Sequence, residues 1–251
     1  MSPLARYLYS KGISAPEVFC ADTGSDPSVL LEAARYAAER RDPLGRLLAK
    51  NPSLPVQGIV ALIRMHPDQV WQNPAWSYLL AQPSFLGTLG RCQQASLIRS
   101  RFADHRVIRV LAGNRSCDRF VRCMAASSPH CPVDLLEDYP RHAWRVREAL
   151  ASNPRLPMHL QSVLAYDHNW IVRLRLSRRK DLLPSIIDVL MNEGECQDVL
   201  VALVNNHQAT KAHHDRLIDI GSERVRNAVF YRRGRMMSGF TVADLDEEIP
   251  F

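Results

Sequence analysis

A short phrase with two prolines recurs along this chain, and it limits the possible folds more than any other feature. The clearest copy covers residues 146–157 and reads VREALASNPRLP. A shift of 25 residues aligns it with Val121-Arg122, Ala126, Ser128-Pro129 and Pro132. A shift of 26 aligns His142, Trp144, Val146-Arg147 and Leu150 with His168, Trp170, Val172-Arg173 and Leu176. Self-similarity at a fixed period of this length predicts a repeat architecture.

Weaker copies of the phrase extend the period in both directions. One contains Val199, Leu203 and Asn206, and the last contains Val225-Arg226. Upstream, residues 47–55 read LLAKNPSLP. Between the copy at residues 47–55 and the copy that begins at Val121, the regular spacing is lost, at about residues 63–117. An insertion and a run of degenerate repeats are both open interpretations of that irregular region.

Each copy of the phrase predicts two short helices. Val146 and Leu150 are four residues apart and place one apolar stripe on a helix. Pro154 ends that helix near Ser152, because proline disfavours the helical conformation of the residue before it. Pro157 suits the start of a second helix, where its missing N–H has no partner to lose. The unit is therefore a helical hairpin.

Helices of about 8–10 residues are too short to be stable alone in water, so the hairpins must pack on one another. We therefore expect an all-α fold, an α-solenoid of short paired helices over residues 44–235. Residues 1–43 are expected to form an N-terminal helical cap, with a capped helix that begins at Asp26-Pro27. Residues 236–251 form an acidic C-terminal tail.

The pattern Val-Arg-x-x-Leu-Ala-x-Asn-Pro-x-x-Pro, complete at residues 146–157, resembles the leucine-rich repeat variant family. The resemblance covers roughly residues 44–62 and 118–233. It implies a right-handed, HEAT-like superhelix of short paired helices and a scaffold or interaction role. Some members of that family carry an iron–sulfur region before the repeats, which needs four thiolates. This chain has only Cys20 in its first 91 residues, so we do not transfer the cluster.

Charge is unevenly distributed along the chain. Arginine provides 28 of the 32 basic residues, and residues 99–235 hold 23 basic against 15 acidic residues. The tail after residue 235 has four acidic residues and no lysine or arginine. A basic excess attracts phosphates or an acidic protein. No apolar run is long enough to cross a bilayer, and no signal peptide is evident, so we expect a cytoplasmic protein without membrane contact.

Catalytic and cofactor motifs are not evident in the sequence. Cys117, Cys123 and Cys131 are spaced unlike zinc ligands, and no phosphate loop or nucleophile motif is present. The expectation is a protein without enzymatic activity, metal or cofactor.

An arginine follows the inward valine at the same position of several repeats: Arg122, Arg147, Arg173 and Arg226. This column would suit an anionic partner. The favoured interpretation is instead that each arginine pairs with an acidic or carbonyl group of the adjacent repeat.

The pairs His142/Trp144 and His168/Trp170 occupy equivalent positions, which predicts that they stack where consecutive repeats begin. Seam filling between repeats is favoured. The alternative is an exposed aromatic ladder that anchors a partner.

The densest basic cluster contains Arg173, Arg175, Arg178 and Arg179, and Arg232 and Arg233 follow two repeats later. A positive stripe on one face of the C-terminal half is expected from it, and neutralising Arg178, Arg179, Arg232 and Arg233 together should weaken binding of an anionic ligand.

Three functional hypotheses follow. The first is a scaffold that binds a protein partner, and the alternative is nucleic-acid binding through the basic C-terminal half. These differ in salt dependence, since phosphate contacts weaken steeply as salt rises. A third hypothesis is that the acidic tail masks the basic half until a partner displaces it.

Overall fold

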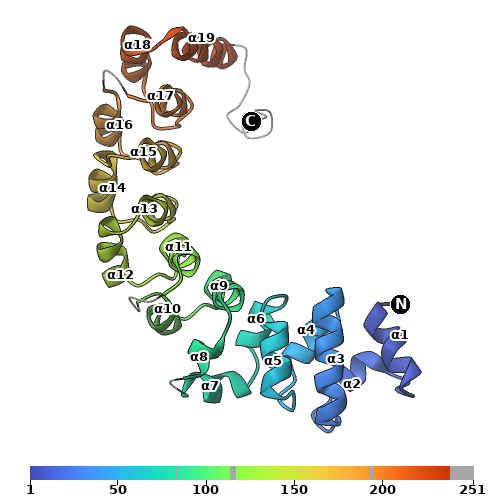
Figure 1. Cartoon of the computed structure of the whole chain (residues 1–251). Coiled ribbons are helices and arrows are strands. Elements are labelled where there is room, and N and C mark those ends of the chain that lie inside the picture. The colour runs from blue at the N-terminus through green and yellow to red at the C-terminus, as the bar shows by residue number, and fades with distance from the viewer. Residues whose placement is uncertain (83, 114–116, 193–194, 238–251) are drawn as a thin grey trace. The chain divides into compact units, whose positions relative to one another are not determined.

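The computed structural model of the chain describes residues 1–82, 84–113, 117–192 and 195–237. Regular structure in these residues is helical throughout, with nineteen α-helices, one short 3-10 helix and no strand (Figure 1). The all-α expectation is therefore confirmed. Apart from residues 236 and 237, the acidic tail lies outside the described residues.

The chain divides into two compact units, Met1–Leu135 and Leu136–Phe251. The helices of the first unit are α1 (Pro3–Ser10), α2 (Pro16–Ala21), α3 (Pro27–Arg40), α4 (Gly45–Lys50), α5 (Val56–Leu62), α6 (Pro67–Trp71), α7 (Ala75–Leu80), α8 (Phe85–Thr88), α9 (Arg91–Arg99), α10 (His105–Ala112) and α11 (Arg119–Ser127). Helix α12 (Val133–Asp138) crosses the boundary between the units.

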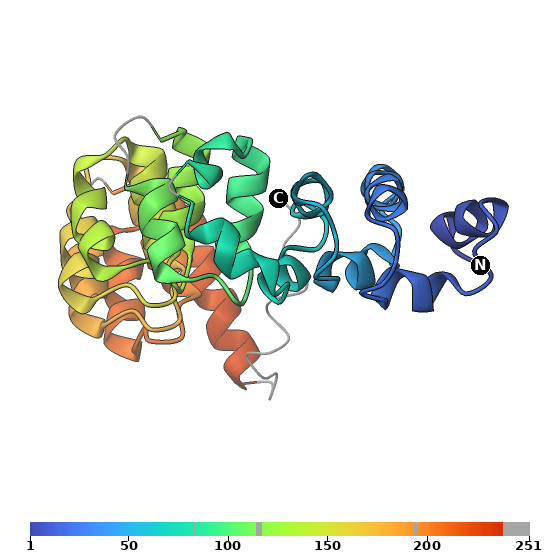
Figure 2. The same cartoon turned by 90° about the horizontal axis from the view of Figure 1, so that it is seen from below.

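Helices of the first unit pack in two rows. In what we call its first row, α2 packs against α4, α4 against α6, α6 against α9 and α9 against α11. In the second row, α3 packs between α1 and α5 (Figure 2). The first-row helices therefore alternate along the chain with the helices that cover them.

The region expected to be irregular, at about residues 63–117, contributes α6 and α9 to the first row. Along the chain, two very short helices, α7 and α8, lie between α6 and α9, whereas other repeats have one second-row helix at this point. Trp76 packs edge-on against Trp71 and Phe85, with ring centroids 5.5 and 5.7 Å apart. The packing supports the degenerate-repeat interpretation over an insertion, and the split second helix explains the lost phase.

The second unit contains η1 (Tyr139–Arg141), α13 (Trp144–Ala151), α14 (Met158–Ala165), α15 (Trp170–Ser177), α16 (Pro184–Leu190), α17 (Gln197–Val204), α18 (Lys211–Ile220) and α19 (Glu223–Met237). Its first row is α13, α15, α17 and α19, each packed against the next, and α14, α16 and α18 form the second row (Figure 1). The predicted boundaries hold here, since α13 ends one residue before Ser152 and α14 begins directly after Pro157.

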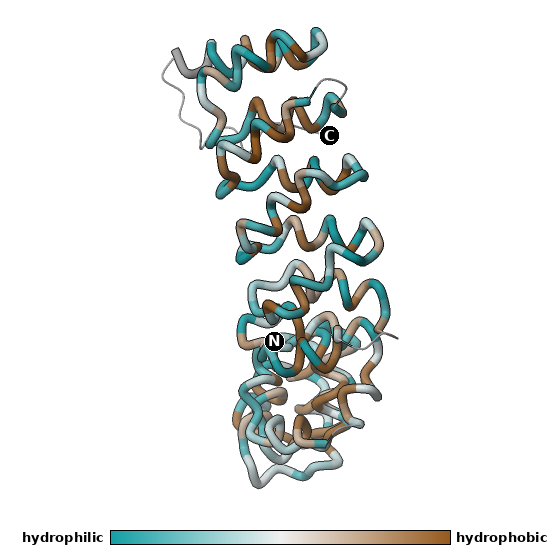
Figure 3. The backbone as a smooth tube through the Cα atoms, turned by 90° about the vertical axis from the view of Figure 1, so that its left-hand side faces the viewer, coloured by the Kyte–Doolittle hydropathy of each residue, from teal (hydrophilic) through white to brown (hydrophobic). Residues whose placement is uncertain are grey.

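Each first-row helix of the second unit buries a pair of apolar residues four apart. Val146 and Leu150 are at most 1% exposed, and Val172, Leu176, Val199, Leu203, Val225 and Val229 are fully buried. Apolar and polar segments accordingly alternate along these helices (Figure 3). This is the stripe that the repeated phrase predicts.

Asparagines of the Asn-Pro phrase are buried because they bind carbonyl groups of the preceding first-row helix and its turn. Asn51 Nδ2 donates to the carbonyl oxygens of Cys20 and Asp22, at 3.1 and 2.9 Å. Asn73 Nδ2 donates to those of Ala49 and Asn51, both at 2.9 Å. The last carbonyls of a helix lack hydrogen-bond partners within that helix. The asparagine of one repeat therefore supplies the missing donor to the helix end of the repeat before it.

Asn206 repeats this contact in the second unit. Its Nδ2 donates to the carbonyl oxygens of Ser177 and Arg179, both at 2.7 Å, and its Oδ1 accepts from Gln208 N at 2.9 Å. The same geometry therefore joins neighbouring helices in both units.

Helix α3 begins as predicted, with Pro27 in its first turn and the Asp26 side chain accepting from Ser28 N at 2.7 Å. Two further helices, α1 and α2, precede it. The capped helix is consequently an inner member of the second row rather than the end of the unit.

We predict that Asn206→Ala lowers the free energy of unfolding by about 2–4 kcal/mol, because two buried carbonyls lose their donor. Asn227→Ala, at an exposed position of α19, is the matched control and should change it by less than about 0.5 kcal/mol. Urea unfolding followed by helical circular dichroism measures both. Equal, small effects of the two substitutions would contradict a structural role for Asn206.

Candidate interaction site

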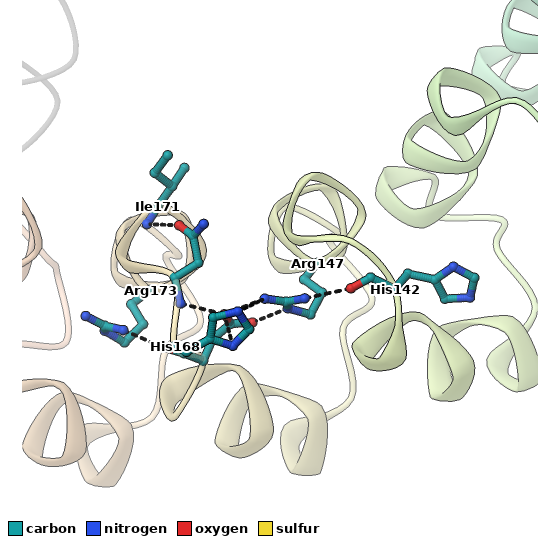
Figure 4. A network of polar contacts seen from close by, with 7 residues as sticks. His142, Arg147, His168, Ile171 and Arg173 are labelled. Atoms are coloured by element: carbon teal, nitrogen blue, oxygen red, sulfur yellow. Dashed lines mark hydrogen bonds and ion pairs between the residues drawn. The ribbon is translucent and has the colours of Figure 1, made fainter.

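Buried arginine–carboxylate pairs connect consecutive first-row helices of the second unit, and Figure 4 shows the contacts of Arg147. Arg147 on α13 donates from Nε and Nη2 to the Asp167 carboxylate, at 2.5 and 2.9 Å, and from Nη1 to the carbonyl oxygen of His142. Arg173 on α15 donates from Nε and Nη2 to the Glu195 carboxylate, at 2.6 and 2.7 Å, and from Nη1 to the carbonyl oxygen of Asp167. Both carboxylate side chains are 4% exposed.

These contacts confirm the favoured interpretation of the arginine column at Arg147 and Arg173. The hydrogen bonds to Asp167 and Glu195 raise the pKa of the two guanidinium groups. Arg226 in the last copy is exposed, and Arg122 is half-buried. Arg147 and Arg173 thus link one repeat to the next, and their charges are paired and not available to a ligand.

Two of the arginines expected on a positive stripe, Arg179 and Arg232, are buried. Arg179 Nη1 donates to the carbonyl oxygens of Ala151 and Asn153, at 2.9 and 2.6 Å. Arg232 Nη2 donates to that of Asn206 at 3.1 Å, and burial lowers the pKa of its guanidinium. The stripe prediction is wrong for both residues, since they bind backbone inside the unit.

This role is hidden in the sequence because Arg179 and Arg232 stand beside other arginines. A shift of 26 residues carries Asn153 to Arg179 and Asn206 to Arg232. The two arginines therefore occupy the asparagine position of the phrase and supply the same kind of donor to the preceding turn. The 26-residue alignment with the asparagines was therefore the sequence signal that could have predicted this role.

The other members of the basic cluster lie at the surface. Arg175 pairs with Glu148 of the neighbouring helix at 3.3 Å, and Arg233 pairs with Asp215 at 2.5 Å. Arg178 is exposed. Exposed pairs of this kind contribute little to stability, so these arginines can exchange their partners for a ligand.

The two His/Trp pairs occupy different surroundings. His142 is partly buried, with Nε2 at 2.8 Å from the Asp138 carboxylate and its ring edge-on to Tyr139. The equivalent His168 has an 84% exposed side chain. Its Nε2 lies 3.2 Å from Arg147 Nη2 (Figure 4). Seam filling therefore describes His142 and not His168.

Trp144 is half-buried under the guanidinium of Arg145, whereas Trp170 is 41% exposed. No ring contact joins the two tryptophans in the part of the chain that the structure describes. The expected stacked ladder is thus absent from that part, and Trp170 is the more accessible of the two rings.

In the second unit, the described residues leave one side of the first row uncovered. On α15 it presents Ile171, Leu174, Arg175 and Arg178, spaced as one helix face, and none of them is buried. The equivalent residues are also unburied: Arg145, Glu148, Ala149 and Ser152 on α13, Asp198, Val201, Ala202 and Asn205 on α17, and Arg224, Asn227, Ala228 and Tyr231 on α19. We call these residues the first-row face.

The first-row face has an apolar centre and charged margins. Leu174, Val201 and Ala202 are partly exposed on adjacent helices. Around them, Arg175 pairs with Glu148, and Arg224 pairs with Asp198 at 2.8 Å. An apolar centre with a polar rim is the usual composition of a protein interface.

Groups that bind metals do not gather at this face. Among the described residues, no three His, Cys, Asp or Glu side chains are placed to hold a metal ion. His213 and His214 are buried, and the His214 Nε2 lies 3.1 Å from the Val204 carbonyl oxygen. Burial lowers the pKa of His214.

Comparisons of the chain with known protein families, with curated proteins and with solved structures gave no match. In the described part of the chain, no helix combines the length and apolar character needed to cross a bilayer.

We predict that Asp167→Ala destabilises the protein by about 3–5 kcal/mol, because it leaves the Arg147 guanidinium buried without its carboxylate. The double substitution Arg147→Met/Asp167→Leu should restore most of that loss. Asp215→Ala, which removes the exposed partner of Arg233, is the control and should cost less than about 1 kcal/mol. Urea unfolding of the four proteins checks this, and an Asp167→Ala protein as stable as the control would refute it.

Proposed function

We propose that this chain is a non-enzymatic repeat scaffold whose first-row face binds a protein partner. The observation that carries the proposal is a cluster of partly exposed apolar residues on adjacent helices: Leu174 and Val201 occupy matched positions of α15 and α17, and Ala202 follows Val201. Side chains of this kind gain free energy when a partner removes them from water. Trp170, at the margin of the face, adds the residue type most enriched among interface anchors.

The packing supports the solenoid that the sequence predicts. In each unit, every first-row helix contacts the next one along the chain, which is the nearest-neighbour order of a helical repeat protein. In the second unit, the described residues leave the first-row face uncovered. The scaffold role implied by the resemblance to the leucine-rich repeat variant family agrees with it, and a cytoplasmic location stays a prediction from the sequence.

The arginine contacts favour a protein partner over the alternative, a nucleic acid. Phosphate binding needs cations that face solvent, but Arg147, Arg173, Arg179 and Arg232 bind carboxylates or carbonyls inside the second unit. These four arginines of the second unit are therefore not available to phosphates.

We predict that Leu174→Glu/Val201→Glu removes the partner, because two carboxylates would then lie in the apolar centre of the interface. The measurement is quantitative mass spectrometry of proteins captured from the producing cells by the wild type, this variant and a control. The control, Met158→Glu/Val163→Glu, changes residues that are 60% and 51% exposed on α14 of the second row.

A genuine partner should fall at least tenfold with the first-row variant and remain with the control. A set of captured proteins unchanged by the first-row variant would refute the proposal. Binding that disappears as salt rises, with nucleic acid in the captured material, would support the nucleic-acid alternative instead.

A further inference from the structure

The first-row face has a charge pattern that selects among partners. Beside its apolar residues the face holds four arginines, Arg145, Arg175, Arg178 and Arg224, against two carboxylates, Glu148 and Asp198. The centre between them is apolar. Such a surface is complementary to a segment that carries both apolar and acidic side chains.

This chain contains a segment of that composition directly after α19. Residues 238–251 read SGFTVADLDEEIPF, and they lie outside the described residues. Five of their side chains are large and apolar, four are acidic and none is basic: Phe240, Val242, Leu245, Ile249 and Phe251, with Asp244, Asp246, Glu247 and Glu248. The chain thus contains both the first-row face and a segment that is complementary to it in charge and apolar character.

The length of the segment is sufficient for it to reach the face. Helix α19 belongs to the first row and carries the chain to residue 237. An extended chain covers about 3.3–3.6 Å per residue, so fourteen residues span at most about 50 Å. Packed helices are about 8–10 Å apart, which puts α15 about 20 Å from α19.

We propose that residues 238–251 bind the first-row face of their own chain and occupy it until an acidic, apolar segment of the partner displaces them. Phe240 or Leu245 would cover the apolar centre at Leu174 and Val201, and the acidic residues would meet Arg175 and Arg178. The inference rests on the proposed function, because it identifies the chemistry of the partner for the same face. It also makes the face self-regulating.

Tethering determines the size of the expected effect. A segment on a short flexible link has an effective concentration of about 1 mM at its site. If the free peptide binds with a Kd of about 100 μM, the tethered copy occupies the face in about nine molecules of ten. An added peptide must then bind the native chain about tenfold more weakly than a chain whose own segment is disabled.

The experiment uses full-length chains and a fluorescent peptide of residues 238–251, followed by anisotropy. The disabled chain carries Phe240→Ser, Leu245→Ser, Ile249→Ser and Phe251→Ser, which remove apolar groups but keep the length and charge of the segment. We expect the peptide to bind the disabled chain about tenfold more tightly than the native chain. Raising the salt concentration from about 0.05 to 0.5 M should weaken binding severalfold, because exposed charge contacts are screened.

Two further variants of the disabled chain locate the binding. Leu174→Glu/Val201→Glu should reduce peptide affinity at least tenfold, and Met158→Glu/Val163→Glu should leave it unchanged. Light scattering should show a monomer for the native chain. A dimer would overturn binding within one chain and assign the segment to a second copy.

Absence of peptide binding to the disabled chain, or equal binding to the native and disabled chains, would overturn the inference. Either result leaves the proposed function standing if Leu174→Glu/Val201→Glu still removes captured partners. Loss of that capture effect, with peptide binding intact, would refute the proposed function alone.

Discussion

Carbonyl groups at the ends of α2, α4, α13, α15 and α17 are bound by side chains from further along the chain, and the arrangement of the rest depends on these bonds. Most of these contacts are buried, and an unbound buried carbonyl costs about 1–3 kcal/mol. Asn51, Asn73 and Asn206 supply two donated bonds each to the preceding turn, and Arg179 supplies two at the same register. Because the donor comes from the following repeat of the same unit, the end of one first-row helix is bound only when the next repeat is in place.

Contacts inside the second unit also occupy several of its arginines. Buried carboxylates at Asp167 and Glu195 need the guanidinium groups of Arg147 and Arg173, and Arg179 replaces an asparagine as carbonyl donor. What remains for a ligand is the uncovered side of the row, where Leu174 and Val201 lie between exposed arginines. The proposed partner and the proposed tail contact both follow from that surface.

Much of the fold was predictable from the sequence, because the repeated phrase encodes local rules. Pro154 and Pro157 fixed the end of α13 and the start of α14, and Val146 and Leu150 identified the buried stripe. Contacts between neighbouring repeats were harder to predict from the sequence. Arg179 and Arg232 resembled surface residues because their neighbours in the sequence are arginines. The repeat period is not recognisable at α7 and α8, because two short helices replace one second-row helix there. The different burial of His142 and His168 depends on local neighbours such as Tyr139, which the alignment of repeats does not reveal.

The central claim is that side-chain donors to buried carbonyls link the helices one neighbour at a time. Hydrogen exchange of Asn51→Leu, resolved by mass spectrometry of peptides, tests this claim most directly. We expect faster exchange in α2, α4 and α6, near the lost contacts with Cys20 and Asp22, and unchanged exchange in α9 and α11. An equal increase throughout residues 1–135 would contradict it, because the unit would then open as a single body.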